Sequence, residues 1–405
     1  MTLPRRIFVF VILLVAGALA LVMVPLIIGV WRNLQRSDLA AQCRAASERR
    51  KWNELRKLAD SWIAWDSQNA EAWQFRAKAA NAQHDWPAAA DSFWRVSDTD
   101  PQAIPSLIEV SKIAFTHLND PLKGRDACER ILRIDPRAAG AHQQLIWFHA
   151  MTLQREKLLQ QILAAIAAQQ EPREAYVYFF LADTLRSSTA VQLNAHWLEA
   201  NRDEEMFLVA RVLHLTDSET ASSGSPAASS NDDQPLNADG RSKLELVDEL
   251  LQRFPHNLEL LAHKALERLT ANDPHAAANL LAQAPPAAAQ DSRFWRIKGW
   301  IHESNNELDE AATAYRRGLE LHALDWSTMN RLAIVERRRQ NIDEVQRLTQ
   351  YREQAHEIRR QLRQQPAVEL VTPSILRELL TLCHECGEQE IGPALERRFA
   401  NFKTR

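Results

Sequence analysis

Apolar residues recur along most of this chain at the three- and four-residue spacing that places them on one face of a helix. The stretch HDWPAAADSFWRVSDTDP, residues 84–101, shows this pattern with Trp86, Ala89 and Phe93 on one face. Small alanines let two antiparallel helices approach closely, and aromatic rings fill the space between them. Together with the similar residues that precede it, this stretch predicts a helical hairpin over residues 70–101.

The hairpin pattern repeats. Pro101, Pro136 and Pro172 follow the predicted second helices at intervals of about 35 residues, and similar helix pairs return after residue 292. One hairpin cannot bury its own apolar face, so its neighbours must stack on it. This period and pattern resemble the tetratricopeptide (TPR) repeat family. The positions that carry the resemblance are Trp73, Ala77, Ala80, Trp86, Ala89, Phe93 and Pro101 in the clearest copy, and Trp295, Gly299, Leu308, Ala311, Tyr315 and Gly318 in a later one.

The resemblance implies a fold and a binding surface. The fold is an all-α, TPR-like α-solenoid of helical hairpins, which the composition also favours, since the chain has only 10 glycines in 405 residues. The family uses the concave face of its solenoid to hold a protein or peptide partner. The inward-facing positions carried over from the family are Gln74, Lys78, Asn81, Arg296, Trp300, Glu303, Asn330, Ile334 and Arg337.

Charge and missing motifs narrow the function classes. The formal net charge of −3 provides no positive field for nucleic acid, so we expect no nucleic-acid partner. The chain has no phosphate-binding glycine loop, no nucleophile elbow and no complete zinc-protease motif. No residue is a candidate catalyst, and we expect neither an enzyme nor a cofactor.

A long apolar run lies near the N-terminus. Residues Ile7 to Val30 form an uninterrupted run of about 24 residues, which as a helix exceeds the roughly 30 Å hydrocarbon core of a bilayer. The run predicts one N-terminal transmembrane helix that precedes the solenoid. A cleaved signal peptide is the alternative, because Ala18 to Ala20 imitate a cleavage site, but the run continues well past the usual length of a signal peptide's apolar region.

The predicted localisation follows from this run. We expect a single-pass protein of the cell membrane. Arg5 and Arg6 before the run favour an inside N-terminus, whereas several arginines after it favour the opposite orientation. Because long domains translocate largely regardless of charge, we place the solenoid on the periplasmic or exoplasmic side.

The composition also divides the chain. Residues 216–240 are rich in Ser, Ala, Asp, Asn, Pro and Gly, which cannot bury enough apolar surface to offset the entropy of ordering. We interpret them as a disordered linker, either between two solenoid halves or within one continuous stack. The predicted segments are a tail (1–6), the transmembrane helix (7–30), a first solenoid block (37–215), the linker (216–240), a second block (241–350) and C-terminal helices that form a degenerate repeat (351–405).

One cysteine pair suggests chemistry. Cys383 and Cys386 form a C-x-x-C, a spacing that suits a redox dithiol or half of a zinc site. No second pair of metal ligands completes a zinc site, and no βαβ pattern surrounds the motif. Cys383 also falls on an apolar helix face, and Gly387 ends the predicted helix. We therefore favour a structural role for the pair and keep redox or metal binding as the alternative.

The sequence as a whole predicts a scaffold. We expect a membrane-anchored, TPR-like protein that binds a protein or peptide partner in its concave groove. A redox or metal-binding accessory protein that uses Cys383 and Cys386 is one alternative. A tether that works through self-association is another.

Overall fold

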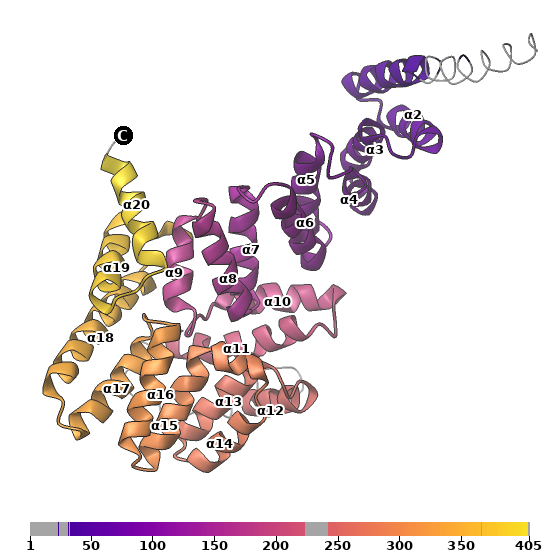
Figure 1. The fold of residues 1–405 in the computed structure, drawn as a ribbon. Helices are drawn as coiled ribbons and strands as arrows, with labels where there is room; N and C mark the ends of the chain where they lie inside the picture. Colours follow the sequence, from indigo (N-terminus) through magenta and orange to yellow (C-terminus); the bar gives the residue numbers. More distant parts are fainter. Residues whose placement is uncertain (1–22, 24–30, 32, 223–241, 366, 404–405) are drawn as a thin grey trace, which may run out of the picture. The chain divides into compact units, whose positions relative to one another are not determined.

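The computed structural model describes residues 23, 31, 33–222, 242–365 and 367–403, and the regular elements in these ranges are all helices (Figure 1). The helices belong to two compact units, Met1–Ile134 and Asp135–Arg405. Each unit is described by itself below. The all-α prediction is confirmed for the described residues.

The first unit consists of helical hairpins. A helix whose described part covers residues 33–48 pairs with the helix after it, and two further pairs follow along the chain. Asn69 and Asp85 cap two of these helices, because their side chains accept hydrogen bonds from backbone N–H groups three residues on. The labelled helices are α2 (Trp52–Trp65), α3 (Ala70–Ala82), α4 (Trp86–Trp94), α5 (Ala103–Thr116) and α6 (Pro121–Ile134).

The second unit continues the same hairpin architecture and adds two short 3₁₀ helices. Its elements are α7 (Ala139–Met151), α8 (Arg155–Ala167), α9 (Arg173–Leu181), α10 (Ser188–Ala200), α11 (Glu205–Ser222), α12 (Lys243–Arg253), α13 (Leu258–Thr270), α14 (Pro274–Ala282), η1 (Pro286–Gln290), α15 (Ser292–Ser304), α16 (Leu308–Leu321), α17 (Trp326–Arg338), α18 (Ile342–Arg363), η2 (Val368–Leu370), α19 (Pro373–Cys386) and α20 (Ile391–Lys403).

The turns inside the hairpins share one backbone geometry. In seven hairpins one residue other than glycine between the two helices adopts the left-handed conformation, with φ between 51° and 64°, and Gly387 adopts it after α19. The next residue's N–H donates to a carbonyl five or six residues earlier, as in the hydrogen bond from Glu307 N to His302 O at 2.9 Å. In chain order these residues are Arg50, His84, Asn119 and Leu153, spaced 34, 35 and 34 residues apart, and then Asn272, Asn306 and Gln340, spaced by 34.

This period is the one that the sequence pattern predicts. The hairpins, their common turn and their spacing confirm a TPR-like organisation of the described chain.

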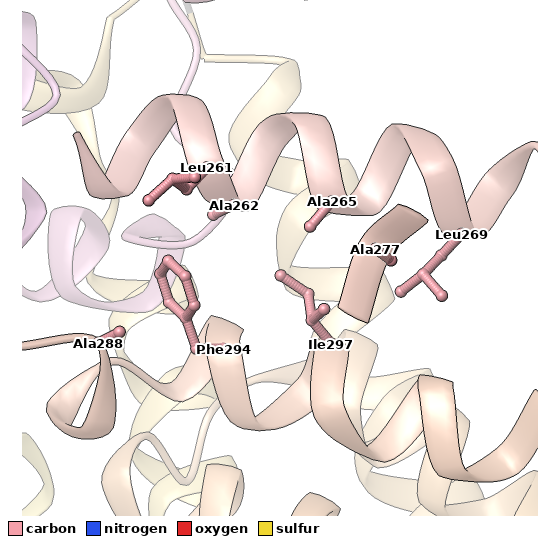
Figure 2. Packing of buried hydrophobic residues seen from close by; sticks show 8 residues of the cluster. All are labelled: Leu261, Ala262, Ala265, Leu269, Ala277, Ala288, Phe294 and Ile297. Atoms are coloured by element: carbon pink, nitrogen blue, oxygen red, sulfur yellow. The ribbon is translucent and has the colours of Figure 1, made fainter. Parts of the chain in front are cut away.

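Small residues set the distance between the helices of a pair. Figure 2 shows Phe294 and Ile297 of α15 directed towards the small residues of α13, among them Ala262 and Ala265. In the next hairpin, a Cβ atom added to Gly299 would lie 2.6 Å from the Tyr315 ring. The glycine therefore makes room for the tyrosine.

The C-terminal elements of the second unit contact a helix near its start. The Tyr178 hydroxyl of α9 donates to Glu369 of η2 at 3.4 Å, and Arg398 of α20 donates to the Glu171 carbonyl at 3.1 Å. The first pair of residues is 191 positions apart in sequence and the second 227. The C-terminal elements of this unit therefore pack against the segment around α9.

The predicted membrane localisation is contradicted. In the described part of the chain no helix is long and apolar enough to cross a membrane. Even α18, with 22 residues, has arginine and glutamate along its length, and placing such charges in hydrocarbon is costly. The prediction of a single-pass protein of the cell membrane, with its solenoid on the exoplasmic side, is wrong on this finding. The predicted spanning segment, residues 7–30, lies outside the described residues except for Met23.

Candidate functional site

The predicted groove residues of the first unit lie on α3. Lys78 is exposed, and Gln74 and Asn81 are half-buried. On the same helix, Arg76 Nε donates to Asp60 Oδ1 of α2 at 2.8 Å. This ion pair helps to fix the position of α3 within the unit. Of the three predicted groove residues on α3, Lys78 is the exposed one.

Arg296, on α15, is buried rather than groove-facing. Its guanidinium lies 2.5 Å from the Asp325 carboxylate and 3.2 Å from that of Asp183, and these three side chains are at most 6% exposed. Asp325 also accepts hydrogen bonds from two backbone N–H groups at the start of α17, which makes it a helix cap as well as an ion-pair partner. Arg296 thus connects α15, α17 and the segment after α9.

The ion pairs of Arg296 belong to a larger buried network. Arg155 of α8 lies 2.6 Å from Asp183 and 3.6 Å from Asp291. Arg293 pairs with Asp291 at 2.7 Å and holds both oxygens of Glu259 at 2.5 and 2.6 Å. The network joins elements on both sides of residues 223–241, since Arg155 and Asp183 precede this segment and the others follow it.

The carboxylates of the network are stabilised in their charged form. Burial alone would raise the pKa of Asp183, but Arg155 and Arg296 outweigh it and hold that pKa well below its usual range. Asp291 behaves in the same way, because Arg293 and Arg155 outweigh its burial and lower its pKa. Buried charges with matched partners of this kind fix one arrangement of helices, because removal of one partner leaves another charge uncompensated.

The remaining predicted groove residues differ in their exposure. Arg331 lies 3.3 Å above the Trp300 ring, and Glu303 accepts a hydrogen bond from the Tyr315 hydroxyl at 2.8 Å. Asn330 accepts from Arg352 at 3.1 Å. The side chains of Trp300, Glu303 and Asn330 are therefore engaged in contacts within the protein. Ile334 and Arg337, on the outer part of α17, are exposed.

The cysteine pair lies at the C-terminal end of α19. Cys383 is fully buried and Cys386 is half-buried, and both are free thiols. Burial raises the pKa of Cys383 well above its usual range and that of Cys386 to about 12, so both thiols are protonated at neutral pH. In the described ranges, no group of three or more His, Cys, Asp or Glu side chains is placed to hold a metal ion. Cys383 packs in the core, and nothing in the described structure supports the redox or metal alternative.

A cleft of about 800 Å³ lies in the second unit, and no pattern in the sequence predicts it. We name it the α16–α19 cleft, because the ends of α16 and α19 and the facing sides of α17 and α18 form its walls, with Phe179 of α9 on one side. Its residues come from segments up to about 200 positions apart, so no local motif could have indicated it. Among the residues that line the cleft, Cys386 alone belongs to a candidate site predicted from the sequence.

No protein-family profile matches the chain, and no curated protein matches it significantly. Among solved structures, the chain is similar to a tetratricopeptide repeat protein from Parabacteroides merdae, with 11% identity over 74% of this chain and 98% of that one and a TM-score of 0.27. It is also similar to MamA, from residue 41 to its end, from Desulfovibrio magneticus, with 14% identity over 47% of this chain and 96% of that one and a TM-score of 0.28. Yeast Tom70 matches with 12% identity over 90% of this chain and 87% of that one and a TM-score of 0.29.

Proposed function

We propose that this protein is a scaffold that binds a protein or peptide partner on the surface of its stacked hairpins. One observation supports the proposal above the others: predicted groove positions on the first helices of two hairpins remain open to solvent. These positions are Lys78 on α3 and the pair Ile334 and Arg337 on α17. Exposed apolar and arginine side chains on neighbouring helix turns are typical anchors for a partner.

The buried and half-buried positions have a different part in this proposal. Arg296, Trp300, Glu303 and Asn330 hold the helices in register, so that the exposed positions are presented at a fixed spacing. A binding test that used Arg296→Ala would therefore confuse loss of binding with loss of folding. The test needs residues whose side chains are exposed.

The double variant Ile334→Asp, Arg337→Glu meets this need. We expect affinity capture from the native host with the full chain to recover a partner protein that the double variant loses. The matched control is Arg317→Glu on α16, whose side chain is exposed and pairs with Glu320 at 2.7 Å. Circular dichroism should show equal melting temperatures for all three proteins.

Two outcomes would contradict the proposal. If the wild-type protein and the double variant capture the same partners in equal amounts, α17 is not the binding surface. If crosslinking recovers only a second copy of the chain, the protein acts through self-association instead.

A further inference from the structure

The α16–α19 cleft combines an apolar floor, an acidic rim and a buried histidine without a hydrogen-bond partner. From these three features we propose that the cleft binds a peptide segment of a partner protein in which a basic side chain stands beside an apolar one. The inference rests on the scaffold function proposed above and names a second surface and the chemistry of its ligand.

The floor of the cleft is apolar and formed by packed helix faces. Met329, Leu332 and Leu348 are buried, and Leu319 and Leu321 are half-buried at the end of α16. A volume of about 800 Å³ lies in the range of sites that enclose a ligand. Apolar side chains of a ligand would replace water on this floor, and such burial is the usual source of affinity in a concave site.

The rim carries an excess of negative charge. Its charged side chains, apart from histidine, are Glu320, Glu344, Glu385, Glu388, Glu390, Arg316 and Arg347. Both arginines are already paired within the protein, Arg347 with Glu344 at 2.5 Å and Arg316 with Glu336 at 2.6 Å. The five glutamates of the rim outnumber its two arginines, so the rim keeps an excess of negative charge.

Two carboxylates of the rim have no cation beside them. Glu385 accepts hydrogen bonds from the amides of Gln350 and Gln354 at 3.2 and 2.7 Å, and Glu390 lies close enough to Glu388 to raise its pKa further, beyond the effect of burial. Neither Glu385 nor Glu390 has an ion-pair partner among the described residues. Like charges that crowd one rim favour a ligand of opposite charge.

His322 points to a ligand independently of the rim. It follows α16, lines the cleft and is only 2% exposed, with its ring against Phe179 at a centroid distance of 5.3 Å. Neither ring nitrogen has a hydrogen-bond partner in the part of the chain that the structure describes. Burial lowers the pKa of His322, against the opposing effect of Asp183, so the ring is neutral and offers one donor and one acceptor.

An unpaired buried donor or acceptor is costly for a protein, and the backbone of a bound peptide supplies both complementary groups. A peptide also explains why an apolar floor and an acidic rim occur in the same cleft. A single small cation would satisfy the rim but not the floor.

The test measures binding of defined probes to the full chain by fluorescence anisotropy. The first probe is a labelled hexapeptide of alternating leucine and lysine, the second is its leucine and glutamate counterpart, and the third is lysine amide as an unlabelled competitor. We expect the lysine peptide to bind, with an affinity that falls as salt is added, and the glutamate peptide not to bind. Hydrogen exchange should slow at residues 319–323 and 384–390 when the lysine peptide is present.

Two variants locate the site. Glu385→Gln with Glu390→Gln removes two charges and keeps the side-chain shape, and we expect it to weaken binding about fivefold. His322→Phe keeps a ring against Phe179 and removes both nitrogens, and we expect a similar loss of about fivefold with an unchanged or higher melting temperature. The matched control is Glu310→Gln with Glu353→Gln, which removes two exposed carboxylates elsewhere in the same unit.

Each other outcome would overturn the inference. If the control variant weakens binding as much as the Glu385 and Glu390 variant, the peptide responds to overall charge alone. The same lysine peptide without its label serves as the reference competitor. If lysine amide displaces the labelled lysine peptide as well as this reference does, the ligand is a small cation rather than a peptide. If no probe binds while partner capture through Ile334 and Arg337 succeeds, the cleft proposal fails and the scaffold proposal stands.

Discussion

Arg296 illustrates how one side chain can hold three helical segments together. It pairs with Asp183 and Asp325 in a place where water cannot replace it. Its sequence context, RFWRIKGW, has arginines three residues apart beside apolar residues. That spacing shows that Arg293 and Arg296 share a helix face with core residues, but it does not show whether the face meets solvent or aspartates from distant segments.

The substitution Arg296→Met should destabilise the second unit. Methionine keeps most of the volume but leaves Asp325 buried without its main partner, so we expect the free energy of unfolding to fall by about 3 kcal/mol. Urea unfolding followed by circular dichroism measures this loss. The control is Arg317→Met, which breaks an exposed pair with Glu320 and should change stability by less than about 1 kcal/mol. Equal effects of the two substitutions would show that the buried network contributes little.

His214 should make the second unit sensitive to mild acid. The Ser187 N–H donates to its Nδ1 at 3.1 Å, so its Nε2 must donate to the Met151 carbonyl, also at 3.1 Å. Burial and the nearby Arg186 lower the pKa of His214 to about 3, and burial likewise lowers that of His263 to about 4. The folded state thus resists protonation that the unfolded chain accepts below about pH 6.5.

Stability should therefore decrease as the pH falls below about 6.5. Between pH 6.5 and pH 5, His214 alone should remove about 2 kcal/mol. The depressed pKa values of Asp183 and Asp291 reduce stability only below about pH 4, where the unfolded carboxyls take up protons, so this interval isolates the histidines. Urea midpoints at pH 7 and pH 5 should differ less for His214→Gln than for the wild type, whereas exposed His275→Gln should leave the difference unchanged.

At the scale of the helix, the sequence predicts which helices pair better than it predicts where each helix ends. The small and aromatic positions locate α3 with α4 and α15 with α16, because helix packing depends directly on those residues. The predicted stop at Asp100–Pro101 lies six residues beyond the end of α4, which is at Trp94. A proline shows where a helix cannot continue, but the last turn depends on packing and caps, so a helix can end before it.

Paired glycine substitutions test the close packing of hairpins. Gly299→Ala would place a methyl group 2.6 Å from the Tyr315 ring, so we expect a loss of about 1–3 kcal/mol from overpacking. Gly140→Ala on α7 has nothing within 4 Å of the new carbon and should gain about 0.5 kcal/mol from helix propensity. Melting temperatures should shift in opposite directions for the two variants. A shift in the same direction would show that Tyr315 moves aside without cost.

At the scale of the whole molecule, contacts between distant segments decide the arrangement within the second unit. A repeat period predicts which neighbours stack, but it contains no information about Tyr178 and Glu369, or about the α16–α19 cleft. The period likewise could not distinguish the two alternatives for residues 216–240. The ion pairs of Arg155 and Arg296 now join segments before and after that region.

Cleavage between residues 223 and 241 tests whether those ion pairs hold the unit together. We expect that the full chain, cut at an inserted protease site in this range, still elutes from gel filtration as one species at moderate salt. The same cut in a chain with Arg155→Met and Arg296→Met should hold its two fragments together less tightly, because the buried ion pairs of these arginines across the cut are lost while contacts such as Tyr178 with Glu369 remain. If the fragments of the unsubstituted chain elute separately, the result favours two independent solenoid blocks. This is one of the two alternatives given for the linker, residues 216–240.

The left-handed residue in each hairpin turn has a consequence for how this protein can change. Residues with a side chain tolerate that conformation poorly compared with glycine, at a cost of about 1 kcal/mol each. Arginine, histidine, leucine, asparagine and glutamine all occupy it in this chain. Replacement of any one of these residues by glycine would therefore stabilise its hairpin turn. In evolution, such single substitutions could compensate for destabilising mutations elsewhere in the chain without changing the proposed binding surface.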